Sequence, residues 1–445
     1  MAQREGTVQG TRQRVIGDQI GRAGPGLVGM RGLGGLRGLV GWIGWLMTAI
    51  ALTLGAPAAT AQPQQGPGAA AGQDQSEAKK VVYLVVFPGE FGRDVSRTPV
   101  AEVVEDIKKV QPDIVVVRFD QSFSFQGESR ADFDPNAGEV AFQQQLETAR
   151  ELSTLLGERI LQDKEWVKKP QMVGWVDKAL GGAAFLPFMF KDLYYTSGAL
   201  HGGLGGLESL FNNVGNGPAR EKQRSLRLAR AQGIANLGDP DGSQKRELLI
   251  RAMSRAETEL SYSLVDGKPV YYTDATTGEF LLTNDGTEQQ NIDTIEDVVR
   301  FRGKNVLTLN SETAFQLGVA RGIADNIEDI AFDLGVSRSY ELTRGQSQKI
   351  FRDWQREINK AERDLQELLR QVLEIQAGGG TQQQAASEAR SRLISIYTRA
   401  IRIIQRYKES INPQPIGGDW EEFINELNIR IDNLRREIRN ANTQR

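Results

Sequence analysis

Cysteine is absent from this chain of 445 residues, and histidine occurs once, at His201. The missing thiols exclude disulfides, a cysteine nucleophile, thiolate zinc sites and a lipid-anchored cysteine. A single imidazole excludes multi-histidine metal centres and makes any Ser-His-Asp triad depend on one residue. Catalysis by side chains therefore has to use serine, lysine or carboxylates, and we predict no cofactor.

The apolar run from Leu39 to Leu54 is too short for a comfortable membrane span, which takes about 20 residues. It follows a glycine-rich stretch that carries arginines, and it precedes small residues at Ala59 and Ala61. This is the pattern of a signal peptide with its cleavage site. We expect residues 1–61 to be a signal peptide, or alternatively an uncleaved anchor that associates with the membrane. The remaining chain is then exported to the periplasm or cell envelope.

The charge of the chain is unevenly distributed. Residues 62–80 offer almost nothing apolar to bury and are typical of a flexible linker. The formal net charge of −3 combines +4 on residues 1–61, +4 on residues 335–445 and −11 on the segment between them. An acidic body without a basic stripe is a poor nucleic-acid binder, so no nucleic-acid partner is expected.

Residues 81–335 have the pattern of an α/β domain. Val81–Phe87 and Pro112–Phe119 are β-branched runs typical of buried parallel strands. Between them we expect a helix with Thr98 as N-cap and Pro99 at its first position, which completes a βαβ unit. A helix from Glu139 to about Lys168, a strand at 171–176 and a short strand at 192–196 follow. The sheet is therefore predicted to be mainly parallel.

The second half of this domain turns polar and helical after Gly217, and three further features are predicted. Asp266-Gly267 suits a type I′ turn between two alternating strands, which indicates a β-hairpin. A strand then leads into a helix capped by Ser311, and another helix closes the domain. Potential calcium ligands stand at every second position at Asp132, Asp134 and Asn136. The glycine that follows is one place late for a calcium loop, so no metal is assigned.

Residues 336–445 carry three heptad seams and are expected to form a helical bundle. A purely structural packing unit and a partner-binding or homo-oligomerising arm both remain open. The seams consist of Phe351, Trp354, Ile358, Ala361, Leu365, Leu368, Val372 and Ile375, then Ala386, Ala389, Leu393, Ile396, Ala400, Ile403 and Tyr407, and finally Trp420, Ile424, Leu427, Ile431, Leu434 and Ile438.

Three stretches together resemble the ClpP/crotonase superfamily, and more closely the exported Ser-Lys peptidases of the SppA and NfeD type. They are "VVYLVVF…PDIVVVRFD", "KKPQMVGWVDKALGGAAFLPFMFKDLYYTSGALHGGLGG" and "NVLTLNSETAFQLGVARGIADNIEDI". The order of the stretches agrees with that family, and the resemblance covers about Val81 to Gly335. It implies that the domain is a spiral of βαβ units. Because relatives with this domain assemble into rings, it also implies that this chain forms a homo-oligomer.

The resemblance assigns two catalytic positions, a serine that this chain lacks and a lysine that it has. The family serine falls on Gly181, with Gly182 after it, and the general-base lysine falls on Lys222. In a Ser-Lys pair, a lysine in apolar surroundings takes the hydroxyl proton while backbone N–H groups hold the oxyanion. Glycine supplies the N–H but no oxygen, so this chain is expected to bind a carbonyl without attacking it. Lys222 is alternatively a solvated helix residue.

Other residues offer poor substitutes for the missing nucleophile. Ser197 stands at the family's proline position in the loop that follows, and Ser122, Ser124 and Ser129 lie after the second strand. His201 is expected to be a loop residue. The oxyanion-loop glycines of the family are replaced by "DQSFSFQGES". A crotonase-type hydratase would need glutamates where Phe185 and Gly205 stand.

These observations predict an exported, catalytically degenerate scaffold that binds peptides or partner proteins. The alternative is an active peptidase with another nucleophile. A crotonase-type hydratase and a purely oligomerising structural protein are less favoured hypotheses.

Overall fold

The computed structural model describes residues 79–121, 135–202, 216–238, 243–255, 258–283, 307–377, 383–411 and 419–443. They all belong to one compact unit, Asp74–Arg445, whereas the other unit, Met1–Gln73, lies outside the described residues. The signal segment and most of the linker predicted at 62–80 therefore lie outside them as well.

The described body is a mixed α/β structure built on a seven-stranded sheet. The strand order is β10-β1-β2-β3-β4-β8, with β9 also paired to β4, and only the β4–β8 pair is antiparallel. The prediction of an α/β fold with a mainly parallel sheet is confirmed. The strands are β1 (Lys80–Phe87), β2 (Ile114–Gln121), β3 (Gln171–Leu180), β4 (Asp192–Gly202), β8 (Thr308–Asn310), β9 (Gly322–Ile323) and β10 (Tyr340–Thr343).

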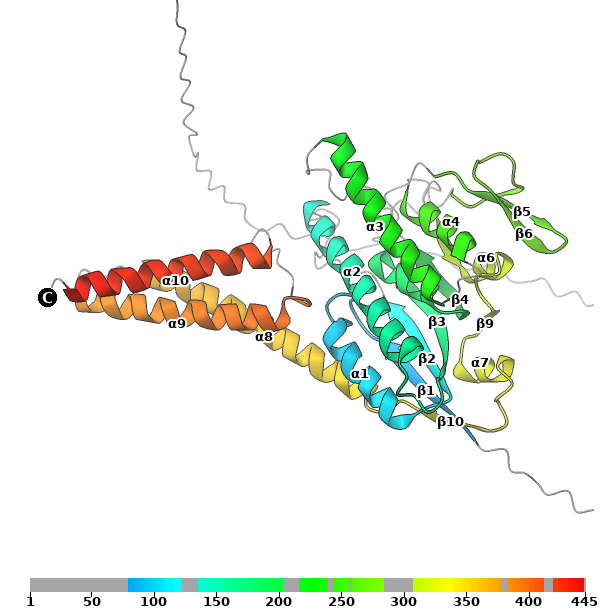
Figure 1. The fold of residues 1–445 in the computed structure, drawn as a ribbon, viewed down its shortest axis with the longest axis horizontal. Coiled ribbons are helices and arrows are strands. Elements are labelled where there is room, and N and C mark those ends of the chain that lie inside the picture. Colours follow the sequence, from blue (N-terminus) through cyan, green and yellow to red (C-terminus); the bar gives the residue numbers. More distant parts are fainter. Residues whose placement is uncertain are drawn as a thin grey trace, which may run out of the picture. The chain divides into compact units, whose positions relative to one another are not determined.

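Both faces of the sheet are covered, as its apolar strands require. Alternate residues of β1 show this: Tyr83, Val85 and Phe87 join the larger core, whereas Val82 and Leu84 join a smaller one. The larger core packs under α1 (Arg97–Val110), α2 (Pro135–Leu156) and α3 (Gly217–Gly238), which lie side by side in Figure 1. Residues of α7 (Ile327–Asp333) cover the opposite face.

The βαβ unit forms as predicted, but its helix begins differently. Ser96, not Thr98, is the N-cap of α1, and its side chain makes no capping hydrogen bond. Thr98 lies inside the helix, where its hydroxyl donates to Glu409. The predicted cap at Thr98 is wrong because a distant carboxylate engages this hydroxyl.

The helix predicted to reach Lys168 stops earlier. After α2 the chain makes a π-helical turn, η1 (Gly157–Gln162), and then runs to β3 in a loop. A 3-10 helix, η2 (Gly181–Met189), joins β3 to β4. The short strand expected at 192–196 is longer, because β4 continues to Gly202.

The second half of the body contains α4 (Ser243–Ser254), the hairpin β5 (Ser261–Val265) and β6 (Lys268–Tyr272), β7 (Phe280–Leu281) and α6 (Ser311–Gln316). Asp266 and Gly267 both have positive φ, as a type I′ turn requires, so the hairpin prediction is confirmed. The cap of α6 is Asn310, whose side chain accepts from the Thr313 N–H. Ser311 does not cap this helix, because its hydroxyl donates to the Ser197 carbonyl oxygen.

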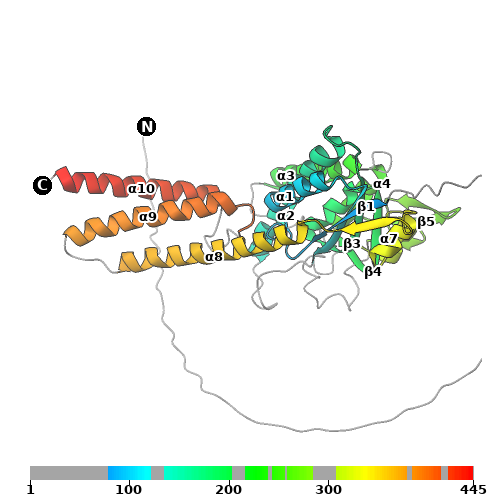
Figure 2. The same ribbon diagram turned by 90° about the horizontal axis from the view of Figure 1, so that it is seen from below.

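The sheet extends past the domain boundary predicted at 335/336. Strand β10 pairs in parallel with β1, and the helical segment begins only at Ser347. It comprises α8 (Ser347–Ala377), α9 (Gln383–Tyr407) and α10 (Trp420–Thr443), which we call the helical arm. Figures 1 and 2 show the three helices side by side, with α9 between the other two.

The arm has its own apolar core, and the predicted seams account for it in part. The first seam is buried from Phe351 to Val372, and the third from Trp420 to Ile431. The second is wider than predicted, since Tyr397, Ile401 and Ile404 are buried there besides Ile396 and Ala400. A helix that packs against a neighbour on each side has to bury more than one narrow stripe.

Candidate functional site

The carboxyl ends of β2, β3 and β4 form the edge of the sheet where the candidate residues lie. Gln121, Ala179 and His201 are register partners across these three strands, so they form a row on one face. The glycine turn, Gly181-Gly182, follows two residues after Ala179. The carboxyl edge of a parallel sheet is the usual place for a binding or catalytic site in an α/β protein.

Gly181 opens η2 with a φ of 65°, a left-handed conformation that glycine adopts freely. A residue with a Cβ would be strained there by roughly 1–2 kcal/mol. All nine residues of η2 are buried, including Gly181 and Gly182. The position that the resemblance assigns to a serine is thus a buried turn whose backbone favours glycine.

The Gly182 N–H is already engaged within the protein. It donates a 3.0 Å hydrogen bond to Oε1 of Gln145, a residue of α2 that is 4% exposed. A Cβ added to Gly182 would lie 2.4 Å from the Gln145 Cβ and 2.7 Å from its backbone carbonyl carbon. The Gln145 carboxamide therefore accepts the bond that a substrate carbonyl would accept in a working oxyanion site.

Lys222 lies in the first turns of α3 with an exposed side chain. The buried face of this helix consists of Leu228, Ala231, Ile234 and Ala235. The neighbouring Glu221 is held by Arg255 at 2.6 Å on the solvated side. A lysine acts as a general base when burial lowers its proton affinity. The structure gives Lys222 none of that burial.

His201 is not the loop residue that the sequence analysis expected, because β4 extends to include it. It is fully buried, with Nδ1 2.6 Å from the Tyr195 hydroxyl and Nε2 2.7 Å from the Ala184 carbonyl oxygen. A carbonyl can only accept, so Nε2 carries the proton and Nδ1 accepts from Tyr195. Burial lowers the pKa of His201 from 6.5 to about 4. The imidazole is therefore neutral and acts as a structural clamp on η2.

Arg246 holds the other end of η2. This arginine of α4 is 5% exposed, and its guanidinium donates to the Phe188 carbonyl oxygen. Its positive charge also contributes to lowering the pKa of His201, after burial. Two carbonyls of η2, those of Ala184 and Phe188, are thus fixed by buried side chains from β4 and α4.

Gln121 ends β2 with a buried carboxamide. It is 1% exposed, and both polar atoms of its carboxamide lack a hydrogen-bond partner among the described residues. An unpaired buried polar group destabilises a fold by about 1–3 kcal/mol. The segment that follows, with Ser122, Ser124 and Ser129, lies outside the described residues, as do Asp132 and Asp134.

The remaining candidates from the sequence take structural positions. Ser197 is an exposed residue of β4 whose N–H donates to Asp325 at 2.7 Å. Phe185 is buried inside η2, where a hydratase would need a carboxylate, and Gly205 lies outside the described residues. Within the described ranges no cluster of three or more potential metal ligands occurs. No helix in those ranges is long and apolar enough to cross a bilayer.

The residues that sequence reasoning missed are Gln145, Tyr195 and Arg246. Gln145 had a detectable signal, because it stands four residues before Ala149 on the stripe that continues through Leu152 and Leu156. A polar residue on an apolar helix stripe indicates a buried hydrogen bond.

A scan of the chain against protein-family models and a search of curated proteins both return no match.

A Cβ at residue 182 tests the packing around the glycine turn. We expect Gly182→Ala to lower the free energy of unfolding by about 1–3 kcal/mol, because the methyl group would overlap Gln145. Gly198→Ala is the matched control, since no atom lies within 4 Å of its added Cβ, and we expect a change below about 0.5 kcal/mol. Urea unfolding followed by circular dichroism measures both. Equal changes in the free energy of unfolding of the two variants would show that residue 182 does not pack closely against Gln145.

The buried His201 predicts a pH-dependent stability. Above pH 6.5 the imidazole is neutral in both states; below it the unfolded chain gains a proton that the folded chain refuses until about pH 4. Stability should therefore fall across that window, by about 3 kcal/mol in total. His201→Gln keeps a donor and an acceptor but does not titrate, so its free energy of unfolding should fall less between pH 7 and pH 4.5. Identical pH slopes would show that His201 is not buried and neutral.

Proposed function

We propose that this chain is an exported, non-catalytic scaffold of the ClpP/crotonase type, related to the NfeD/SppA peptidases, that binds peptides or partner proteins in the cell envelope. The three resembling stretches support the proposal through their order, and the mainly parallel sheet is compatible with it. The spiral arrangement of βαβ units and the export of the chain belong to the same proposal.

The observation that carries the proposal is the hydrogen bond from the Gly182 N–H to Gln145. A Ser-Lys peptidase needs a hydroxyl, a desolvated amine and free N–H donors at one place. Here Gly181 offers no hydroxyl, Lys222 is exposed, and the Gly182 donor is bonded to an internal carboxamide. Each of the three requirements fails for a separate physical reason.

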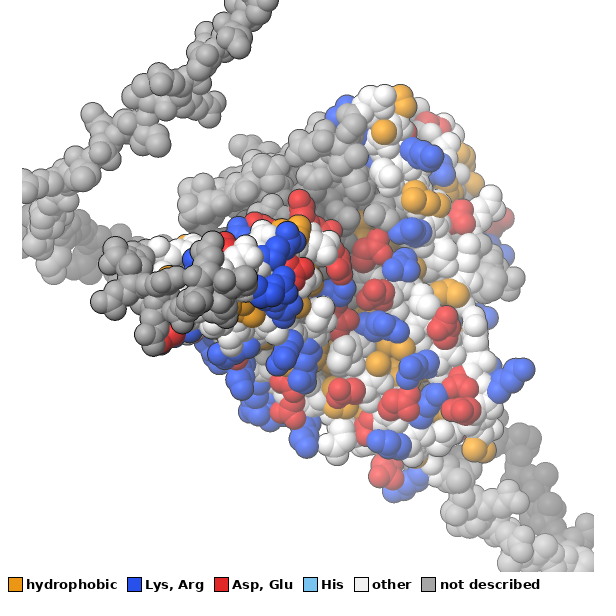
Figure 3. Space-filling view, turned by 60° about the vertical axis from the view of Figure 1, so that its left-hand side comes forward, with side chains coloured by type: hydrophobic (Ala, Val, Ile, Leu, Met, Phe, Trp, Pro, Cys, Tyr) orange, Lys and Arg blue, Asp and Glu red, His pale blue; other side chains and the backbone are white. Residues whose placement is uncertain are grey.

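The surface and the arm favour protein partners over nucleic acid. On the face shown in Figure 3, acidic and basic side chains of the described residues are interspersed over most of the surface. Apart from Phe351, which belongs to the body core, the helical arm buries its seams in a core of its own, which supports an element for assembly or partner binding. Homo-oligomerisation through the arm, and membrane association through residues 1–61, complete the proposal.

The absence of peptidase activity tests this function. We expect the purified chain neither to cleave a quenched-fluorescence peptide library nor to react with a fluorophosphonate probe. Gly181→Ser alone should remain inactive, because the added hydroxyl meets no buried lysine and the Gly182 N–H stays bonded to Gln145.

Cleavage by the unmodified chain would contradict the proposal if Lys222→Ala abolished it while Lys164→Ala, a change of another exposed lysine, did not. That result would establish the rival function, an active peptidase with a nucleophile outside the glycine turn. Cleavage gained by Gly181→Ser would show instead that the oxyanion donors are free.

A further inference from the structure

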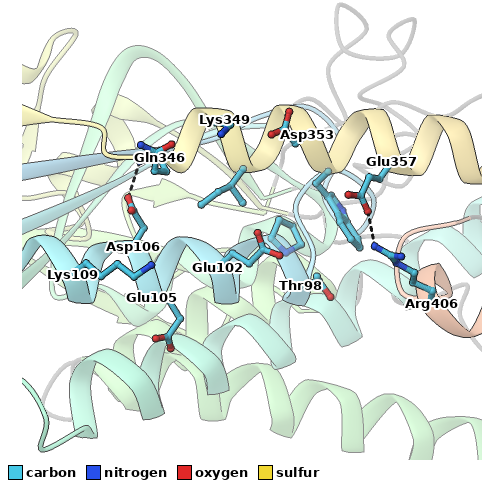
Figure 4. Close-up of a pocket in the computed structure, with 13 residues that line it drawn as sticks. Thr98, Glu102, Glu105, Asp106, Lys109, Gln346, Lys349, Asp353, Glu357 and Arg406 are labelled. Atoms are coloured by element: carbon cyan, nitrogen blue, oxygen red, sulfur yellow. Dashed lines mark hydrogen bonds and ion pairs between the residues drawn. The ribbon is translucent and has the colours of Figure 1, made fainter.

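A groove of about 670 Å³ lies between α1 of the body and α8 of the helical arm. Figure 4 shows the two helices running in opposite directions along it, with Asp106 opposite Gln346 at one end and Thr98 near Glu357 and Arg406 at the other. We call it the α1–α8 groove. Its lining is formed by Thr98, Pro99, Glu102, Glu105, Asp106, Lys109, Gln346, Lys349, Ile350, Asp353, Trp354, Glu357 and Arg406.

The groove has the length of a short extended peptide. Its walls run from Thr98 to Lys109 on α1 and from Gln346 to Glu357 on α8. Eleven helical steps correspond to roughly 16 Å at 1.5 Å per residue. An extended chain advances about 3.3 Å per residue, so about five residues fit between the two ends. A single small amine would occupy only a fraction of this length.

The floor of the groove is apolar and held in place. It consists of Pro99, Ile350 and Trp354, and the Trp354 Nε1 donates to the Arg93 carbonyl oxygen at 3.2 Å. One turn earlier on α8, Phe351 packs its ring against Phe87 in the body core, with centroids 5.8 Å apart. The wall formed by α8 is therefore anchored to the body.

A salt-bridge network fixes the same junction beyond the groove. The Arg93 guanidinium donates to Glu362 at 2.8 Å and to Asn359 at 2.6 Å, both on α8. Its third partner is Asp94, at 2.9 Å. Because one guanidinium joins the loop after β1 to two successive turns of α8, the two walls keep their spacing.

The groove carries an excess of carboxylates, five against three basic side chains. Most of them already have partners on neighbouring elements: Asp106 accepts from the Gln346 N–H at 2.7 Å, and Glu357 pairs with Arg406 at 3.2 Å. Glu105 reaches out of the groove to Arg159 at 2.7 Å.

Glu102 differs from these carboxylates. It is exposed and lies between the two ends of the groove in Figure 4, and it has no ion pair among the described residues. Asp353, on α8, pairs with Arg356 of its own helix at 3.4 Å and has no other ion pair among the described residues. The middle of the groove therefore holds a carboxylate that no ion pair among the described residues neutralises.

We propose that the α1–α8 groove binds an extended segment of a partner polypeptide with a lysine or arginine at its centre. The aliphatic stem of that side chain lies on Trp354 and Ile350, and its charged end reaches Glu102. The apolar floor takes the neighbouring side chains of the segment. The proposal deepens the proposed function, because it names where such a scaffold holds its partner and by what chemistry.

Fluorescence anisotropy with a labelled peptide tests the groove. The probe is Ala-Leu-Lys-Leu-Ala, and its counterpart carries glutamate in place of lysine. We expect the full chain to bind the lysine peptide at least about tenfold more tightly than the glutamate peptide, with the preference reduced at 0.5 M salt. Glu102→Lys should weaken binding of the lysine peptide about tenfold.

Glu388→Lys is the matched control, because it makes the same charge change at an exposed position of α9 outside the groove. We expect it to change binding less than twofold. Equal losses in the two variants, or no binding of the lysine peptide to the full chain, would overturn the proposal. Cleavage of the bound peptide would instead overturn the proposed function and leave the groove intact, so the two failures are distinguishable.

Discussion

The hydrogen bond between the Gly182 N–H and the Gln145 carboxamide is the constraint on which the candidate site depends. It joins α2 to the start of η2 at a distance that leaves no room for a side chain on residue 182. Because Gly181 has a left-handed backbone, the turn needs glycine at both positions. His201 and Arg246 then fix the carbonyls of the same short helix. The site is a rigid, internally satisfied turn.

Much of the fold could be predicted from the sequence, because its signals are local. The β-branched runs of β1 and β2 and the turn at Asp266-Gly267 depend on short stretches. The caps at Thr98 and Ser311 were wrong because tertiary partners, Glu409 and the Ser197 carbonyl, engage their hydroxyls. The missing serine was visible at Gly181, whereas the role of Gln145 depends on how α2 packs against η2, which no short stretch encodes.

The helical arm is tied to the body more closely than a heptad pattern alone indicates. Its first seam residue, Phe351, belongs to the body core, and beyond Trp354 the Arg93 guanidinium binds Asn359 and Glu362 of α8. The α1–α8 groove exists because these anchors hold α8 alongside α1. A scaffold whose partner site lies at this junction would couple partner binding to the position of the arm.

Amide hydrogen exchange of Gly182, measured by NMR on a chain labelled with ¹⁵N-glycine, tests the central claim most directly. Gln145→Leu removes the acceptor while keeping most of the side-chain volume, so the account predicts that Gly182 exchanges at least about tenfold faster in this variant. The Gly174 amide, in the central strand β3, serves as the internal reference for global opening. A Gly182 amide that is unprotected in the original chain and exchanges no faster in Gln145→Leu would show that its N–H is free to bind a ligand, and would contradict the account.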